Sequence, residues 1–409
     1  MVSKDGWNHL LGKDATPFLR HEFLSALEDC ACVGGNTGWQ VAHLAIYSSG
    51  DENPIGLMPL YLKSHSYGEY VFDWSWAEAY QQHGLSYYPK ALCAIPFTPV
   101  RGARLLVGEG EQSDAIRIQL IEQLKQLLIQ NEISSAHILF AEEETQELLL
   151  KQGFMARDAV QFHWKNHAYQ SMDDFLSQLN MKRRKNIRQE RSQVQSAGIS
   201  FRHIDGPSAT QEDWTFFYRC YANTYYEHRS SPYLSESFFQ MLSQTMPENL
   251  HLILAHRNEQ LIAASLLFVD RSGHTKTAYG RYWGALEYVP CLHFETAYYQ
   301  AIEYCISQGI DVFEGGAQGQ HKMARGFMPV KMQSAHWIKD PEFSKAVERF
   351  LVRESSGIEN YIDEFQYLLK YEYGQTTFNP PIWQAHGATG PDVVEWLRIF
   401  DSAADHSAD

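Results

Sequence analysis

Residues 250–269 read LHLILAHRNEQLIAASLLFV and carry the clearest structural signal in the chain. Two apolar runs, residues 250–256 and 261–269, flank the polar segment 257–260. Apolar runs of this length on either side of a short polar turn are typical of paired β-strands. We therefore predict an antiparallel hairpin here.

The segments around this hairpin complete an α/β unit. Apolar periodicity predicts two helices before it and a strand, a helix and a strand after it, at residues 212–225, 235–246, 275–282, 292–308 and 310–314. The first half shows a similar order of helix, hairpin, helix, strand, helix and strand, at residues 17–29, 40–47, 55–63, 113–131, 136–140, 143–152 and 154–164. A repeated order of elements without a residue-level repeat indicates duplication followed by divergence.

Length and composition agree with two folded domains. The chain has 409 residues, which is more than one hydrophobic core usually supports. Hydrophobic residues make up 44% and charged residues 20%, as in globular proteins. We expect an α/β (α+β) protein with domains at residues 15–168 and 169–390, followed by a tail at 391–409.

Charge and missing motifs disfavour several classes of protein. The formal net charge of −15 opposes general nucleic-acid binding. The apolar runs are shorter than the roughly 20 residues of a membrane-spanning helix. The N-terminus lacks the apolar segment of a secretory signal, so we expect no membrane span and a cytoplasmic location. The scattered cysteines predict reduced thiols, and no motif with metal-ligand spacing implies a metal.

The densest group of chemically active side chains is DVFEGGAQGQHKMARGF, residues 311–327, at the end of a predicted strand. Its glycines would let the backbone approach a ligand closely and would leave several N–H groups free for an oxygen atom. We predict Glu314 and His321 as catalytic acid or base groups. The ligand-binding residues predicted here are Gly315, Gly316, Gln318, Gly319, Lys322 and Arg325. The alternative is a solvated glycine-rich connection without a function.

A second group is basic and reads MKRRKNIRQER, residues 181–191, in an otherwise acidic chain. On a helix, residues spaced by three and four share one face, so this segment would concentrate positive charge. We predict Lys182, Arg184 and Arg188 as ligands for a phosphate or a carboxylate. The alternative is a solvated helix whose charges pair with nearby acids.

Three shorter segments add further candidates. TAYGRY, residues 277–282, ends a predicted strand beside the start of a helix, whose N–H groups favour an acyl oxygen or an anion. KSHSYGE, residues 63–69, follows a strand, and FTPVRGAR, residues 97–104, contains a proline-fixed bend. The binding residues predicted in and beside these segments are Tyr279, Arg281, Tyr282, His293, Lys63, His65 and Arg101. Core packing of the tyrosines and surface exposure of the others are the alternatives.

Several strings together resemble a known family. FLSQLNMKRRKNIRQERSQV, AASLLFV, TAYGRYWG and FEGGAQGQHKMARGF are similar to the second GNAT-like domain of FemAB-type transferases. LMPLYLKSHSYGEYVFDWSWAEAY and YYPKALCAIPFTPVRGARLL are similar to a FemAB-like bacterial family associated with peptidoglycan biosynthesis or recognition. The resemblance covers roughly residues 17–388. It implies two tandem GNAT-like (acyl-CoA N-acyltransferase) domains.

The resemblance also implies a function. FemAB-type enzymes attach amino acids from aminoacyl-tRNA to peptidoglycan precursors, so we expect an acyl or aminoacyl group to be transferred to the amine of a small molecule or peptide. The donor stays open between aminoacyl-tRNA and acetyl-CoA or another acyl-CoA, because the chain lacks a clean [QR]xxGx[GA] loop for coenzyme A and the long helical arm of some FemAB enzymes. The alternative is a catalytically inactive GNAT-like protein that binds peptidoglycan or nucleotide-linked precursors.

Overall fold

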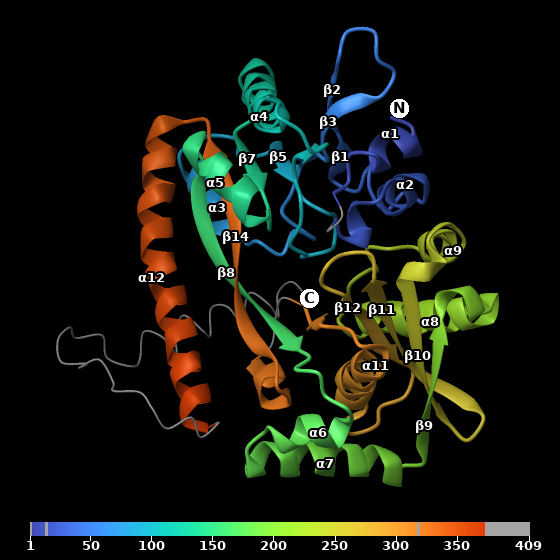
Figure 1. Cartoon of the computed structure of the whole chain (residues 1–409). Helices are drawn as coiled ribbons and strands as arrows, with labels where there is room; N and C mark the ends of the chain where they lie inside the picture. Colours follow the sequence, from blue (N-terminus) through green and yellow to red (C-terminus); the bar gives the residue numbers. More distant parts are fainter. Residues whose placement is uncertain (1, 13–14, 317–319, 373–409) are drawn as a thin grey trace, which may run out of the picture.

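A computed structural model describes residues 2–12, 15–316 and 320–372. One mixed sheet of eleven strands runs through both halves of the chain (Figure 1). In spatial order its strands are β1 (Trp39–Val41), β4 (Tyr61–Lys63), β5 (Lys90–Cys93), β7 (Ser135–Ile138), β14 (Met328–Ile338), β8 (Met155–Lys165), β13 (Val312–Glu314), β12 (Thr277–Ala285), β11 (Gln260–Asp270), β10 (Leu250–Arg257) and β9 (Ile199–Asp205). A smaller sheet contains β2 (Leu44–Tyr47), β3 (Pro54–Met58) and β6 (Leu106–Val107).

Helices pack around these sheets. They are α1 (Lys4–Asn8), α2 (His21–Asp29), α3 (Trp74–Gln82), α4 (Ser113–Gln130), α5 (Glu143–Lys151), α6 (Met172–Ser177), α7 (Met181–Ser196), α8 (Gln211–Glu227), α9 (Glu236–Thr245), α10 (Leu292–Phe294), α11 (Gln300–Gln308) and α12 (Pro341–Glu372). A π-helical segment, Glu295–Tyr299, joins α10 to α11. A 3₁₀ segment, Gln320–Arg325, precedes β14.

The two halves of the chain share the middle of the large sheet. β13 pairs in parallel with β12 and antiparallel with β8, so the second half of the chain joins the first through backbone hydrogen bonds. β14 then returns to the first half and lies between β7 and β8. The long helix α12 covers this part of the sheet (Figure 1). Arg157 of β8 fixes it there through two 2.8 Å hydrogen bonds to the carboxylate of Glu354.

In the second half, α8 lies directly on the sheet. Its first turn is closed by a capping box in which Thr210 and Asp213 exchange hydrogen bonds. The helix passes so close to β12 that a Cβ atom on Gly284 would lie 1.8 Å from the carbonyl oxygen of Cys220. Glycine is therefore required at this position for the helix and the sheet to touch.

The predicted hairpin at residues 250–269 is correct, and β10 pairs with β11 in antiparallel register. The predicted first-half strands at residues 40–47 and 55–63 are each divided in two. β1 and β4 belong to the large sheet, whereas β2 and β3 belong to the small one. His43 lies at the division, where its ring and the Leu60 backbone hydrogen bond to each other.

Residues 2–12, 15–316 and 320–372 contain neither a membrane-spanning helix nor a cluster of metal-ligating side chains. No helix in this part of the chain has both the length and the apolar composition needed to cross a bilayer. The same residues hold no group of three or more His, Cys, Asp or Glu side chains placed to bind a metal ion.

Candidate functional site

A pocket of about 400 Å³ lies where the two halves meet. β13 pairs with β12 only as far as Tyr279 and Glu314, while β12 continues to Ala285. The sheet therefore opens at this point, and the pocket occupies the opening. The first half of the chain contributes Tyr70, Phe97 and Pro99 to its wall, and the second half contributes the rest.

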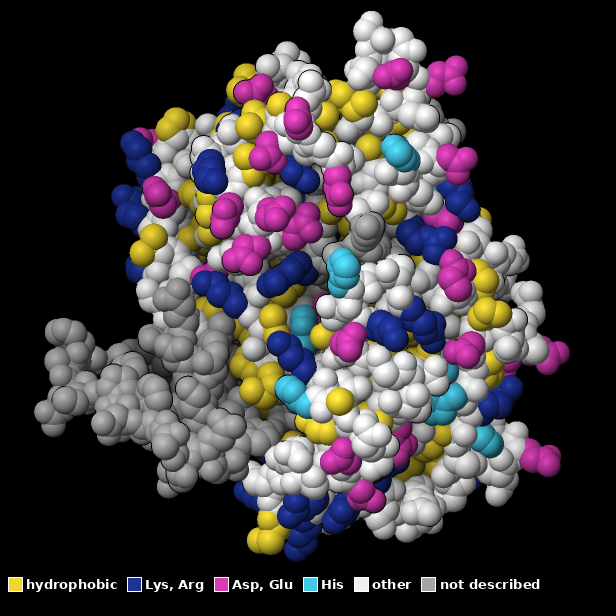
Figure 2. All heavy atoms as spheres, viewed as in Figure 1, with side chains coloured by type: hydrophobic (Ala, Val, Ile, Leu, Met, Phe, Trp, Pro, Cys, Tyr) yellow, Lys and Arg dark blue, Asp and Glu magenta, His cyan; other side chains and the backbone are white. Residues whose placement is uncertain are grey.

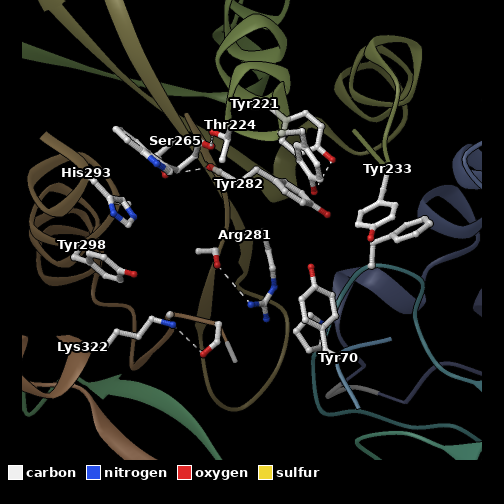
Figure 3. A pocket seen from close by; sticks show the side chains of 18 of the residues that line it. Tyr70, Tyr221, Thr224, Tyr233, Ser265, Arg281, Tyr282, His293, Tyr298 and Lys322 are labelled. Atoms are coloured by element: carbon white, nitrogen blue, oxygen red, sulfur yellow. Dashed lines mark hydrogen bonds between the residues drawn. The ribbon is translucent and has the colours of Figure 1, made fainter. Parts of the chain in front are cut away.

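Two buried cations line the opening, Arg281 on β12 and Lys322 in the 3₁₀ segment (Figure 3). The Nζ atom of Lys322 donates a hydrogen bond of 3.2 Å to the carbonyl oxygen of Gly316. Burial and the positive charge of Arg281 lower the pKa of Lys322 to about 7. The Lys322 amine is therefore present in both its neutral and its cationic form near neutral pH.

Glu314, one of the two predicted catalytic residues, lies behind Arg281 and not among the residues that line the pocket. Its Oε2 atom accepts a hydrogen bond of 3.1 Å from Arg281, and its Oε1 atom lies 3.9 Å from Nε2 of His163. Burial raises the pKa of Glu314, and the charge of Arg281 opposes this effect. The geometry suits a residue that orients Arg281 better than one that takes a proton from a substrate.

The glycines of the predicted ligand-binding loop have different structural roles. The N–H group of Gly315 is not free, because it donates to the carbonyl oxygen of Phe162 in the neighbouring strand. A Cβ atom on Gly315 would lie 2.8 Å from the ring of Phe327, so this glycine permits close packing. Gly316 has a φ of +90° and lines the pocket, and it needs glycine for its backbone conformation. Gln318 and Gly319 lie outside the described residues.

Two histidines and a tyrosine surround the Lys322 end of the pocket. His293 and Tyr298 line it (Figure 3). Nε2 of His321 lies 3.3 Å from the Tyr298 hydroxyl. Burial, with the nearby cations, lowers the pKa of both His293 and His321 to about 4. Both rings are therefore neutral at neutral pH and can accept or donate a hydrogen bond without adding charge.

The other end of the pocket is aromatic. Among the residues that line it are Tyr70, Tyr221, Tyr225, Tyr233 and Tyr282. Burial raises the pKa of Tyr221 and Tyr225 well above the ordinary value, so their hydroxyl groups remain protonated. Among the described lining residues none is Asp or Glu, so this pocket combines two cations with neutral hydrogen-bonding groups. Such a lining favours an oxyanion or an anionic group over a cation.

Residues 1–373 of the chain match the FemAB-like family, which is described as "peptidoglycan biosynthesis/recognition". The chain belongs to the FemAB-like family. No curated protein sequence matches it. The predicted resemblance to this family is thereby confirmed, and the described residues form the predicted mixed α/β fold.

Solved structures with this fold are distant in sequence. The crystal structure of FemX aligns with a TM-score of 0.50 at 11% identity, covering 85% of this chain and 99% of FemX. The structure of L-PGS from Bacillus licheniformis aligns with a TM-score of 0.46 at 10% identity, covering 80% of this chain and 95% of the L-PGS chain. A tandem GNAT protein from the clavulanic acid biosynthesis pathway aligns with a TM-score of 0.40 at 12% identity, covering 78% of this chain and 88% of that protein's chain. The likeness to FemX shows a common fold, and it leaves the substrate open.

Several residues predicted from the sequence of this FemAB-like chain lie beside the pocket or away from it. Tyr279 is buried, and the centre of its ring lies 5.1 Å from the centre of the Phe18 ring. Arg325 donates to both carboxylate oxygens of Glu190 on α7, at 2.8 and 3.0 Å. Arg101 donates to the carbonyl oxygen of Lys331. None of these three lines the pocket.

The predicted basic residues on α7 also lie outside this pocket. Lys182 and Arg188 are exposed, and Arg188 pairs with Asp173 at 2.9 Å. Arg184 hydrogen bonds to the carbonyl oxygens of Ser177 and Leu179. Their role as binding residues for the donor stays a prediction.

Lys63 and His65 belong to the structure of the first half. Lys63 is fully buried and lies over the ring of Trp39, with its Nζ atom 3.6 Å from the ring centre. His65 bonds to the carbonyl oxygen of Thr37 at 3.0 Å. Glu69, at the end of the same segment, accepts a hydrogen bond of 2.7 Å from Lys90.

Sequence reasoning missed most of the aromatic wall. Tyr221 and Tyr225 lie one helical turn apart on α8, in the string FFYRCYANTYYEHRSSPY, residues 216–233. Their spacing and the unusual number of tyrosines were a usable signal. Tyr70 carries no comparable signal, because it reaches the pocket through a left-handed backbone conformation with a φ of +62°.

Proposed function

We propose that this chain transfers an acyl or aminoacyl group to an amine within the pocket between its two halves. Membership of the FemAB-like family supports a transferase of this general kind. The observation that carries the proposal is the pairing of Arg281, held by Glu314, with Lys322, whose pKa is lowered to about 7 by burial and by Arg281. A guanidinium can stabilise the oxyanion of such a reaction, and an amine that titrates near neutrality can accept and return a proton.

The proposed roles follow from the chemistry of acyl transfer. The amine nitrogen attacks the acyl carbon, and negative charge develops on the carbonyl oxygen. Arg281 stabilises this oxyanion. Neutral Lys322 accepts the proton that the amine loses and returns it to the leaving oxygen or sulfur as the bond to the donor breaks. Much of the rate would come from holding the two substrates together in the pocket.

The sequence-based assignment of Glu314 and His321 as proton-transfer groups changes within this proposal. Glu314 orients Arg281, since its carboxylate is already bound to that guanidinium. His321 orients Tyr298 through the 3.3 Å contact. Lys322, which was predicted only as an anion-binding residue, takes the acid–base role because it lines the pocket and titrates in the useful range.

The donor and the acceptor are open, and one experiment addresses both the substrates and the alternative of a binding protein without activity. The protein is incubated with aminoacyl-tRNA or acetyl-CoA together with muropeptides or nucleotide-linked peptidoglycan precursors. Thermal stability and product mass are followed in parallel. The proposal predicts a new amide in at least one combination. Stabilisation by these ligands without any covalent product would favour the binding protein.

A further inference from the structure

The outward side of α7 carries a concentration of positive charge and one prominent apolar side chain. Ile187 and Val194 are buried, so these positions fix which side of the helix faces the protein. The opposite side presents Met181, Lys182, Lys185 and Arg188, all exposed. We call these four residues the basic face. Met181 is 77% exposed, which is unusual for a large apolar side chain.

The helix lies along one edge of the molecule. α7 runs across the lower edge of Figure 1, beside α6, and Figure 2 shows Lys and Arg side chains gathered at the same edge with a hydrophobic side chain next to them. A helix of 16 residues that lies along an edge can rest on a flat surface over its whole length, roughly 24 Å at 1.5 Å per residue.

Most of the positive charge on this face is not neutralised. Within the described residues, Lys182 and Lys185 form no ion pair. Arg188 pairs with Asp173, but both side chains are more than half exposed, so water and salt weaken that pair. By contrast, Arg191 points inward and bonds with Glu295 and Glu303. Acidic side chains therefore neutralise Arg191 on the inward side of α7, whereas most of the positive charge on the outward side is not neutralised.

An exposed aromatic loop lies against the other end of the same helix. Val289 packs with Val194, and the Cys291 thiol lies 3.2 Å from the Gln193 side chain, which places residues 286–291 beside α7. Within this loop Tyr288 is 89% exposed and Leu286 is 39% exposed. The one acid between them, Glu287, pairs with Arg257. Leu286 and Tyr288 are therefore exposed beside the C-terminal end of α7, whereas the basic face occupies the N-terminal half of the helix.

We propose that the basic face and residues Leu286 and Tyr288 form a docking surface for an anionic lipid bilayer. Basic side chains on a helix are attracted to anionic headgroups, and Met, Leu and Tyr side chains enter the interface between headgroups and acyl chains. With a formal charge of −15 the chain as a whole is repelled by such a bilayer, which favours approach by a basic edge such as this one. Charge alone would suit a nucleic acid equally well, and the exposed Met181 and Leu286 favour the bilayer.

Docking would bring the bilayer close to the candidate site without occupying it. Glu190, on the inward side of α7, holds Arg325, which belongs to the same 3₁₀ segment as Lys322. The proposal does not require that the pocket be catalytic, and its test uses no substrate.

The test is sedimentation of the full chain with vesicles. Vesicles of equal parts phosphatidylglycerol and phosphatidylcholine should bind the wild type, and pure phosphatidylcholine vesicles should not. The variant with Lys182→Gln, Lys185→Gln and Arg188→Gln should bind more weakly by on the order of 100-fold, because each basic residue near an anionic surface contributes about a fivefold factor. Added salt should release the wild type. Tyr288→Ser should weaken binding by an amount that salt changes little.

A matched control distinguishes the effect of losing the basic face from the effect of changing the net charge. Lys345, Arg349 and Arg353 are exposed on another helix, α12, where they are spaced four residues apart, and changing all three to Gln alters the net charge by the same amount. This variant should bind as the wild type does. Circular dichroism melting of both triple variants shows whether either has lost its fold.

Three results would overturn the proposal. They are wild-type binding that does not distinguish anionic from neutral vesicles, equal loss in the two triple variants, and binding of bulk tRNA that depends on the basic face while vesicles are not bound. The last result would instead return these residues to the role of donor binding predicted from the sequence.

Discussion

Substitution of two lysines on neighbouring strands tests how the first half of the chain is stabilised. Lys63 on β4 and Lys90 on β5 are partners in register, and both are fully buried. Lys90 donates hydrogen bonds to the carboxylates of Glu69 and Asp73 at 2.7 and 2.5 Å. Lys63 donates to the carbonyl oxygen of Tyr67 at 3.2 Å and lies 3.9 Å from Glu69.

The two lysines differ in charge at neutral pH. Burial, only partly opposed by Glu69, lowers the pKa of Lys63 to about 7. Burial would also lower the pKa of Lys90, but Asp73 and Glu69 outweigh it and raise that pKa. For Asp73, burial is outweighed by Lys90 and the pKa is lowered. Lys90 and Asp73 are therefore a buried ion pair, whereas Lys63 is neutral in part of the molecules.

We expect Lys90→Met to reduce the free energy of unfolding by about 3–5 kcal/mol at pH 7, because it leaves the Asp73 charge buried without a partner. Lys63→Met should cost on the order of 1 kcal/mol, the value of one hydrogen bond. Urea unfolding followed by circular dichroism measures both. Adding Asp73→Asn to Lys90→Met should recover part of the loss. Equal costs for the two lysines, or no recovery in the double variant, would refute this account of the cluster.

Two further predictions concern the pocket and the packing of α8. Because the pKa of Lys322 is lowered from 10.5 to about 7, the folded chain binds fewer protons than the unfolded chain between these values, so this residue adds stability as pH rises from 7 to 9. Unfolding free energies at both pH values should show this rise in the wild type, by up to about 1.4 kcal/mol per pH unit for Lys322. Lys322→Met should show a smaller rise, because it loses this contribution and keeps that of Lys63, whose pKa is also lowered to about 7. A rise of equal size in that variant would mean that Lys322 has an ordinary pKa. Gly284→Ala should destabilise the chain by about 1–3 kcal/mol or more, since its Cβ atom would overlap the Cys220 carbonyl group. Gly357→Ala on α12, where nothing lies within 4 Å of the new atom, should be neutral or stabilising. Thermal melts of both glycine variants and the wild type measure the two effects.

Local patterns predicted the elements of this fold well where burial is continuous along a strand. β10 and β11 are buried along most of their length, so their apolar runs stand out in the sequence. No strand was predicted at β9, because its burial alternates irregularly and it lies at the edge of the sheet. The helix α3 was not predicted, because its buried side is made only of Trp76 and Tyr80.

Long-range pairing is what the sequence could not reveal. Nothing local to β14 indicates that it lies between β7 and β8 of the other half. The pocket also depends on long-range strand pairing, since it lies where β13 ends and β12 continues. Lys322, Arg281 and Tyr282 could be recognised as candidates from their motifs. Tyr70 could not, because it meets them only through the joining of the two halves.

In the proposed mechanism Lys322 acts on the reacting groups in the pocket. The most direct measurement is the single-turnover rate of amide formation, with the donor and acceptor identified by the product screen, for the wild type and Lys322→Met. Lys276→Met serves as the control, because that lysine is exposed and lies outside the pocket. We predict a loss of about 100-fold or more for Lys322→Met and no change for Lys276→Met. Equal rates in the wild type and Lys322→Met would contradict the claim.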